Sequence, residues 1–132
     1  MVSKKHSIFL IFSLLAGQAF ALDCKEAVST PEVSECARID QEKIEKRLNE
    51  VYRRVLKQIE EIGKNPENDF QKDLKKNFIE AQRLWVKFRE ADCNNVYAYW
   101  SGGTIRGLMF TSCMQARAEQ RIKELSEYEK TY

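Results

Sequence analysis

Hydrophobic residues recur at helical spacing in three blocks of the chain. In the first block the steps are three or four residues, which makes one helical stripe; its members are Ile44, Leu48, Val51, Tyr52, Val55, Leu56, Ile59 and Ile62. We expect this helix to begin near Thr30-Pro31-Glu32, because threonine caps free amides and proline suits the first helical position. Gly63 and Pro66 predict its end.

The second block predicts a helix from about Asp69 to Trp100. Its expected inward stripe is Phe70, Leu74, Phe78, Ala81, Trp85 and Phe88. Ser101-Gly102-Gly103 breaks the periodicity and predicts a turn.

The third block predicts a helix that Thr104 caps and that continues towards Tyr128. One side is lined by Ile105, Leu108, Met109, Ser112 and Ala116, with Ile122 and Leu125 further along. No segment alternates strictly between apolar and polar residues, as a half-buried strand does. The pattern predicts an all-α fold, a small antiparallel three-helix bundle.

The N-terminus has the order of a secretory signal peptide. A positive stretch with Lys4 and Lys5 precedes an apolar run over residues 8–15, and Ala19 and Ala21 suit a peptidase site. The run is too short for a membrane span, which needs about 20 apolar residues. Asp23, directly before Cys24, argues against a lipid anchor. We predict a signal peptide over residues 1–21 and a single periplasmic or secreted domain over 22–132, with no membrane anchor.

Removal of the signal peptide changes the chemistry that the chain offers. Lysine plus arginine falls from 22 to 22 − 2 = 20, against 20 acidic residues, so the mature net charge is about zero. We therefore predict no general attraction to nucleic acid or anionic membranes. The single histidine, His6, also leaves, which excludes Ser-His-Asp and Cys-His machinery and histidine-bound metal. The prediction is a protein that binds a protein partner, not an enzyme, with no cofactor or metal.

Four cysteines in a small exported chain predict two disulfides. The alternative, a zinc site, lacks close-spaced pairs, because the gaps are 12, 57 and 20 positions between Cys24, Cys36, Cys93 and Cys113. Cys93 and Cys113 lie at similar distances either side of the turn near Gly102, which favours Cys24–Cys36 and Cys93–Cys113. Pairing Cys36 with Cys93 and Cys24 with Cys113 is also feasible.

The stretch 81–93 carries a distinctive motif, Ala-Gln-Arg-Leu-Trp-Val-Lys-Phe-Arg-Glu-Ala-Asp-Cys. It resembles the central motif of the LprI-like lysozyme-inhibitor family. Other matching parts follow in order: the Cys24 and Cys36 pair, Leu48-Asn49-x-x-Tyr52, Gly102-Gly103-Thr104, and Cys113 with Arg121 and Leu125. The resemblance covers nearly the whole mature chain and implies a bacterial envelope protein that binds and blocks lysozyme. Thr104 stands where serine is common in the family.

The motif residues occupy one face of the second helix. Gln82, Trp85, Arg89 and Cys93 are spaced i, i+3, i+7 and i+11. Counting back through the first turn puts Asn49 and Tyr52 level with Gln82 and Trp85, and Glu45 near Arg89. We expect a partly buried polar network in which Gln82 and Asn49 satisfy each other and Arg89 pairs with Glu45 or with a carbonyl at a helix end. In this interpretation the motif is structural.

The turn between the second and third helices offers the better binding candidates. Tyr97, Tyr99, Trp100 and Arg106 belong to residue types that commonly anchor interfaces. The alternative is that Trp100 and one tyrosine close the end of the core. At the opposite end, Glu60, Glu61, Glu67 and Asp69 form an acidic cluster that either meets a cationic enzyme or is simply solvated.

Two functions remain open from the sequence. The first is a steric inhibitor of lysozyme, warranted mainly by the resemblance. The second is a periplasmic structural or assembly module that binds another periplasmic protein or a cell-wall fragment and does not act on lysozyme. The sequence predicts neither the lysozyme type nor the oligomeric state.

Overall fold

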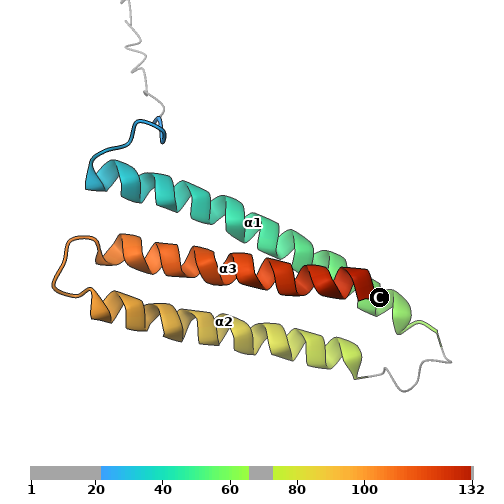
Figure 1. Cartoon of the computed structure of the whole chain (residues 1–132). Helices are drawn as coiled ribbons and strands as arrows, with labels where there is room; N and C mark the ends of the chain where they lie inside the picture. The colour runs from blue at the N-terminus through green and yellow to red at the C-terminus, as the bar shows by residue number, and fades with distance from the viewer. Residues whose placement is uncertain (1–21, 66–72, 132) are drawn as a thin grey trace, which may run out of the picture.

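Three helices form the part of the chain that the structure, a computed structural model, describes: residues 22–65 and 73–131. They are α1 (Thr30–Ile62), α2 (Leu74–Tyr99) and α3 (Arg106–Thr131). In Figure 1, α1 and α3 run in the same direction and α2 runs antiparallel to both. The predicted all-α, antiparallel three-helix fold is confirmed. The predicted signal peptide, and Pro66, Glu67, Asp69 and Phe70 in the first turn, lie outside the described residues.

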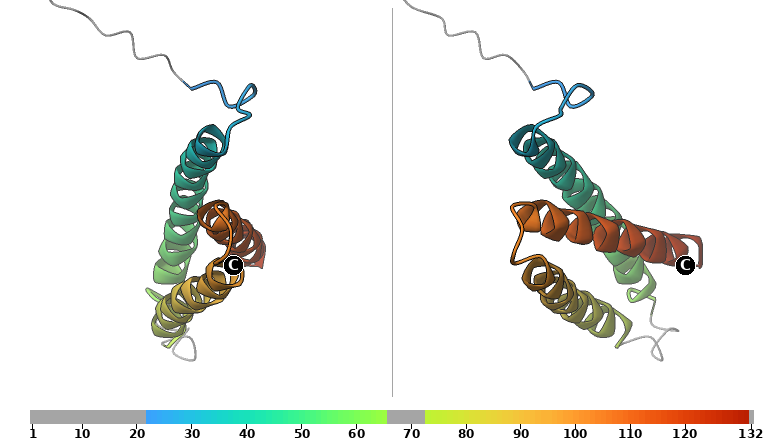
Figure 2. Two further views of the ribbon diagram at one scale, coloured as in Figure 1. Left: turned by 90° about the vertical axis from the view of Figure 1, so that its left-hand side faces the viewer. Right: turned by 60° about the vertical axis from the view of Figure 1, so that its left-hand side comes forward.

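The third helix holds the bundle together. Its contact with α1 is the most extensive and its contact with α2 is second, whereas α1 and α2 touch only sparsely. Figure 2 shows α1 and α2 close together at the first turn and much further from each other at the end where α1 begins. Much of the α2 surface is left uncovered as a result.

The apolar core occupies the half of the bundle near the first turn. Its members come from all three helices: Leu48, Val51, Val55, Ile59, Phe78, Ala118, Ile122 and Leu125. Tyr52 stacks on Phe78 with ring centroids 5.3 Å apart. In the described residues, no helix is both long and apolar enough to cross a membrane.

Two helix starts differ from the prediction. Ser29, not Thr30, caps α1, because its hydroxyl accepts the backbone N–H of Glu32 while its own N–H donates to the Glu32 carboxylate. This reciprocal capping box fixes the start of the helix one residue earlier. The backbone N–H of Met109 donates to the carbonyl of Ile105, which makes Ile105 the residue before α3 and leaves Thr104 in the turn. Gly63 ends α1 as expected.

Part of each predicted stripe on α2 and α3 is also wrong. Ala81 and Phe88 are exposed, and so are Ser112 and Ala116, whereas Ala118 is buried. The inward face of α2 carries Trp85, as the apolar stripe predicted, together with Gln82 and Arg89, which the motif spacing placed there but the apolar pattern alone did not.

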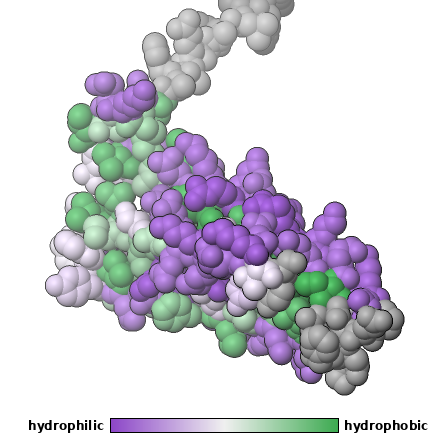
Figure 3. Space-filling view, turned by 45° about the vertical axis from the view of Figure 1, so that its right-hand side comes forward, coloured by the Kyte–Doolittle hydropathy of each residue, from purple (hydrophilic) through white to green (hydrophobic). Residues whose placement is uncertain are grey.

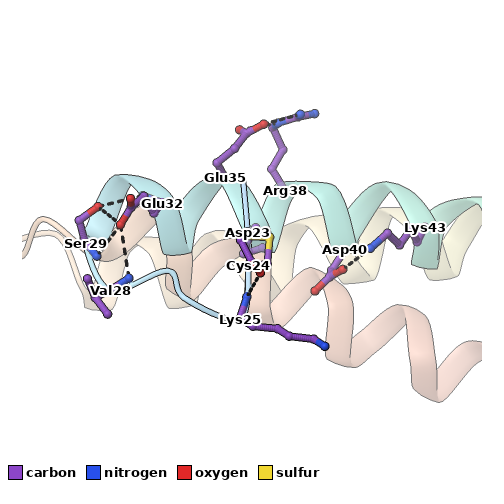
Figure 4. The surroundings of a disulfide bond; sticks show 12 residues. Asp23, Cys24, Lys25, Val28, Ser29, Glu32, Glu35, Arg38, Asp40 and Lys43 are labelled. Carbon is purple, nitrogen blue, oxygen red and sulfur yellow. Dashed lines mark hydrogen bonds and ion pairs between the residues drawn. A yellow bond between two sulfur atoms is a disulfide. The ribbon is translucent and has the colours of Figure 1, made fainter. Parts of the chain in front are cut away.

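The two disulfides join Cys24 to Cys36 and Cys93 to Cys113, the pairing that hairpin geometry favoured. Figure 4 shows the first of them, which ties the segment before α1 back against that helix. Within this segment the Asp23 carboxylate accepts the backbone N–H of Lys25. The second disulfide staples α2 to α3 close to their connecting turn.

Candidate binding surface at the second turn

The turn between α2 and α3 is short and internally bonded. The backbone N–H of Trp100 donates to the carbonyl of Val96, and that of Ser101 donates to Ala98. Gly103 then donates to the carbonyl of Trp100. The Cys93–Cys113 disulfide lies one to two helical turns away. The disulfide and the backbone bonds together restrict the movement of the turn, which we therefore call braced.

Aromatic side chains gather at this turn in two groups. In the first, the Arg106 guanidinium lies over the Tyr97 ring, 5.0 Å from its centroid, and Phe110 meets the same ring edge-on at 6.3 Å. In the second, Tyr99 and Trp100 meet edge-on at 5.9 Å. We call these five residues the aromatic end. Phe110 was absent from the sequence-based set, because it lies five residues beyond the turn, within α3.

The aromatic end is open to solvent. Tyr99 is 85% exposed, and Tyr97, Trp100 and Arg106 are exposed too. None of the five belongs to the apolar core. Figure 3 shows hydrophobic surface gathering towards the end of the bundle that holds this turn, while hydrophilic residues cover most of the middle.

The Arg106 guanidinium has no carboxylate partner among the described residues. Its recorded contact is the Tyr97 ring, which restrains the long side chain without neutralising its charge. A guanidinium can form paired hydrogen bonds to an incoming carboxylate. Arg106 is therefore chemically ready to bind an acidic group of a partner.

An open groove of about 390 Å³ lies beside the aromatic end, between the first turns of α1 and α3. It is lined by Pro31, Ser34, Glu35, Arg38, Thr104, Gly107, Leu108 and Thr111. Arg38 hydrogen-bonds to Glu35 at 2.7 Å and also pairs with Glu42. The bond from Arg38 lowers the pKa of Glu35, so this carboxylate is ionised at neutral pH. Figure 4 draws Glu35 and Arg38 projecting from α1 next to each other, with the bond between them dashed.

The family motif lies deeper, between the helices. Arg89 is 7% exposed, and its Nη1 donates to Glu45 Oε1 at 2.7 Å. Its guanidinium also faces the Trp85 ring at 5.0 Å, and the guanidinium of Arg121 faces that ring at 5.8 Å. Gln41 donates a further hydrogen bond to Glu45 at 2.6 Å. The expected Arg89–Glu45 contact is thus present, inside a larger network.

The expected pairing of Gln82 with Asn49 is wrong. Gln82 Oε1 accepts a hydrogen bond from Arg121 Nε at 3.0 Å, and Asn49 is exposed. Since α1 and α2 touch only sparsely, the nearest donor to Gln82 comes from α3 rather than α1. Cross-helix pairs with α3 could not be placed from the sequence without knowing that α3 packs between the other two.

Other candidate chemistry is already satisfied within the fold. At the first turn, Glu60 pairs with Lys75 at 2.8 Å and Glu61 with Lys64 at 2.7 Å, so these acids are partly neutralised. Near the second turn Asp92 lies beside two cysteine sulfurs, but both belong to a disulfide and cannot act as thiolate ligands.

The fold and the exposed end define a class: a small all-α domain, stapled by two disulfides, that presents aromatic side chains at one end. Within that class the chain belongs to the family described as lysozyme inhibitor LprI, which matches residues 23–125. The family is named for inhibition rather than for a catalysed reaction.

One curated relative is an uncharacterized protein, R02472, from Rhizobium meliloti (strain 1021). It is 28% identical over 112 residues, which span 80% of this chain and 77% of the relative. No solved structure matches the chain.

Proposed function

We propose that the chain is exported, loses residues 1–21, and acts in the periplasm or outside the cell as a steric inhibitor of lysozyme. Its aromatic end would cover the substrate cleft. The family membership supplies the partner class, and the two disulfides suit an oxidising compartment. The observation that carries the choice of surface is the exposed cluster of Tyr97, Tyr99, Trp100 and Arg106 on a braced turn.

The chemistry of a lysozyme cleft complements this cluster. Glycosidases of this kind hold two carboxyl groups on either side of the scissile bond. In the proposed complex, Arg106 donates to a cleft carboxylate while Tyr99 and Trp100 occupy space that sugar rings would fill. The exposed aromatic side chains would bury apolar area with few rotatable bonds to order, which favours tight binding.

Inhibition would depend on local fit rather than on long-range attraction. The mature chain would carry a net charge of about zero, since 20 basic and 20 acidic residues remain after loss of Lys4 and Lys5. A cationic lysozyme would not be steered to it from a distance, so the association rate should depend only weakly on salt.

A lysis assay tests the proposal. Oxidised residues 22–132 are titrated into c-type, g-type and i-type lysozymes acting on cell-wall suspensions, with a reduced and alkylated sample as control. We expect saturable inhibition of at least one type near one-to-one stoichiometry. No inhibition of any type by protein that is folded by circular dichroism would contradict the proposal and favour an envelope assembly module.

A further inference from the structure

One exposed face of α2 reads the same in both directions. Its members follow steps of 4, 3, 4, 3 and 4 residues and are all exposed: Asn77, Ala81, Leu84, Phe88, Ala91 and Asn95. In sequence they read Asn-Ala-Leu-Phe-Ala-Asn, which is symmetric about position 86 apart from the exchange of leucine for phenylalanine. We call this set the α2 stripe.

The stripe is apolar at its centre and uncharged throughout. Leu84 is 57% exposed and Phe88 is 54% exposed, although each is a large hydrophobic residue. Charged residues make up 32% of the chain, yet none lies on these six positions. Because α1 and α2 touch only sparsely, α3 is the principal cover of α2, and it packs on the face of Gln82 and Asp92.

We propose that the α2 stripe binds a second copy of this chain, with the two α2 helices antiparallel. A two-fold interface requires a self-complementary surface, in which residue i faces j and j faces i. With position 86 at the axis, Leu84 faces Phe88 of the other copy, Ala81 faces Ala91, and Asn77 faces Asn95. Alternating steps of three and four residues are also the spacing that lets two helices interlock.

The polar composition of the stripe suits contact with itself. The six positions themselves carry no charge. The Arg117 guanidinium of α3 lies 5.6 Å from the centroid of the Phe88 ring, but it is ion-paired with Asp92, so the charge beside the central layer already has a partner. The terminal asparagines can exchange hydrogen bonds with each other at both ends of the contact. On one flank, each Lys87 lies near Lys87 of the other copy across the axis, and this repulsion opposes association.

The size of the stripe limits the strength of the dimer. The 95 − 77 = 18 steps from Asn77 to Asn95 span about 27 Å at 1.5 Å per residue, on a helix about 10 Å wide. This is less than a standard interface of roughly 800 Å² per partner. The expected dimer is therefore weak, with a dissociation constant above about 10 µM.

Sedimentation analysis of oxidised residues 22–132, from about 10 µM to about 1 mM, tests the proposal. We expect the wild type to shift from monomer to dimer over this range, and Leu84→Asp to raise the dissociation constant at least about tenfold. Val86→Asp is the matched control, because Val86 is also exposed (43%) but points away from the stripe. Added salt should tighten the wild-type dimer by screening the Lys87 pair.

The antiparallel arrangement has its own test. Asn77→Cys protein mixed with Asn95→Cys protein should cross-link through a short bismaleimide more readily than either variant alone. A wild type that stays monomeric, a dimer unaffected by Leu84→Asp, weakening by salt, or preferred Asn77–Asn77 cross-links would each overturn the proposal. If the wild type stays monomeric and Leu84→Asp loses lysozyme binding, the stripe is a lysozyme-binding surface instead. None of these readouts depends on inhibition by the aromatic end.

Discussion

Arg89 illustrates how single side chains determine the stability of this bundle. Its guanidinium is buried, ion-paired to Glu45 and placed over Trp85, yet its Nε has no hydrogen-bond partner among residues 22–65 and 73–131. Burying a charge is favourable only when partners replace water. The network of Gln41, Glu45 and Arg89 therefore specifies how α2 sits against α1 more than it adds net stability.

Replacing Arg89 by alanine should destabilise the oxidised domain by about 3 kcal/mol. The loss leaves Glu45 without its ion-pair partner and opens space beside Trp85. Urea unfolding monitored by circular dichroism measures the change. Arg38→Ala is the control, since its ion pairs are exposed and such pairs contribute at most about 1 kcal/mol. Equal effects of the two substitutions would contradict the structural importance of Arg89.

Replacing Trp85 by alanine should cost about 3–5 kcal/mol, because the indole fills the space between two guanidiniums and packs against the core. Thermal unfolding and a lysozyme-binding assay on the same sample separate stability from recognition. We expect the melting temperature to fall while any remaining folded protein still binds. A variant that kept its melting temperature but lost binding would make Trp85 a contact residue instead.

At the scale of elements, the start of α1 depends on a carboxylate. The pKa of Glu32 is lowered from its usual 4.5, first by the hydrogen bond from the Ser29 hydroxyl and then by the backbone N–H groups of Ser29 and Val28. Figure 4 shows these three bonds converging on one carboxylate. A lowered folded-state pKa gives stability that is complete above the unfolded value and is lost as pH falls through the folded value.

The free energy of unfolding should therefore decrease below pH about 4.5 in the wild type. Glu32→Gln removes this contribution, so the gap between wild type and variant should be widest at neutral pH and close in acid. Glu35 and Glu61, whose pKa values are also lowered by Arg38 and Lys64, keep titrating in both proteins. Urea unfolding at pH 7, 5 and 3 gives the comparison; a gap that widens in acid would rule out the capping explanation.

Each disulfide should contribute about 3 kcal/mol by restricting the unfolded chain. The double variant Cys93→Ala with Cys113→Ala should lose this amount and should also loosen the second turn. Hydrogen exchange at residues 94–105 reads out that loosening directly. Removing the Cys24–Cys36 disulfide by the same substitutions is the control, because it should leave exchange at the second turn unchanged. Equal protection of the turn from hydrogen exchange with and without the Cys93–Cys113 disulfide would contradict the view that this disulfide restrains the turn.

The elements were largely predictable from the sequence, whereas their contacts were not. Three helices, their order and the favoured disulfide pairing follow from apolar spacing, Gly63, the glycines at 102 and 103, and the positions of the cysteines. The motif spacing also placed Gln82 and Arg89 on one inward face, but Phe88, expected on the inward stripe, faces solvent, and the partner of Gln82 was not predicted. Such an arrangement depends on partners such as Arg121, and only the tertiary packing shows which residues those are.

For the candidate site, residue types near the turn identified Tyr97, Tyr99, Trp100 and Arg106, because aromatic residues and glycines concentrate there. Phe110 and the groove beside Gly107 were not predictable, since both depend on how α3 approaches α1. The sequence alone also does not distinguish the surroundings of Tyr97 from those of Tyr99. The structure does, by placing Arg106 over Tyr97 alone.

For the whole molecule, two surfaces divide the exposed hydrophobic residues. The aromatic end lies at the second turn and the α2 stripe runs along the side of the bundle, so a lysozyme and a second copy would bind different parts of the domain. Together they account for most of the large exposed hydrophobic side chains in the described residues: Leu84, Phe88, Tyr97, Tyr99 and Trp100. The core and its polar network hold both surfaces in place.

Inhibition by variants of the aromatic end tests whether this end covers the lysozyme cleft. Tyr99→Ala with Arg106→Ala is compared with the wild type in the lysis assay, and Arg53→Ala, an exposed arginine of α1, is the control. We expect the double variant to keep its melting temperature and to lose inhibition at least about tenfold, while Arg53→Ala inhibits as the wild type does. Full inhibition by a folded double variant would contradict the claim that this end covers the cleft.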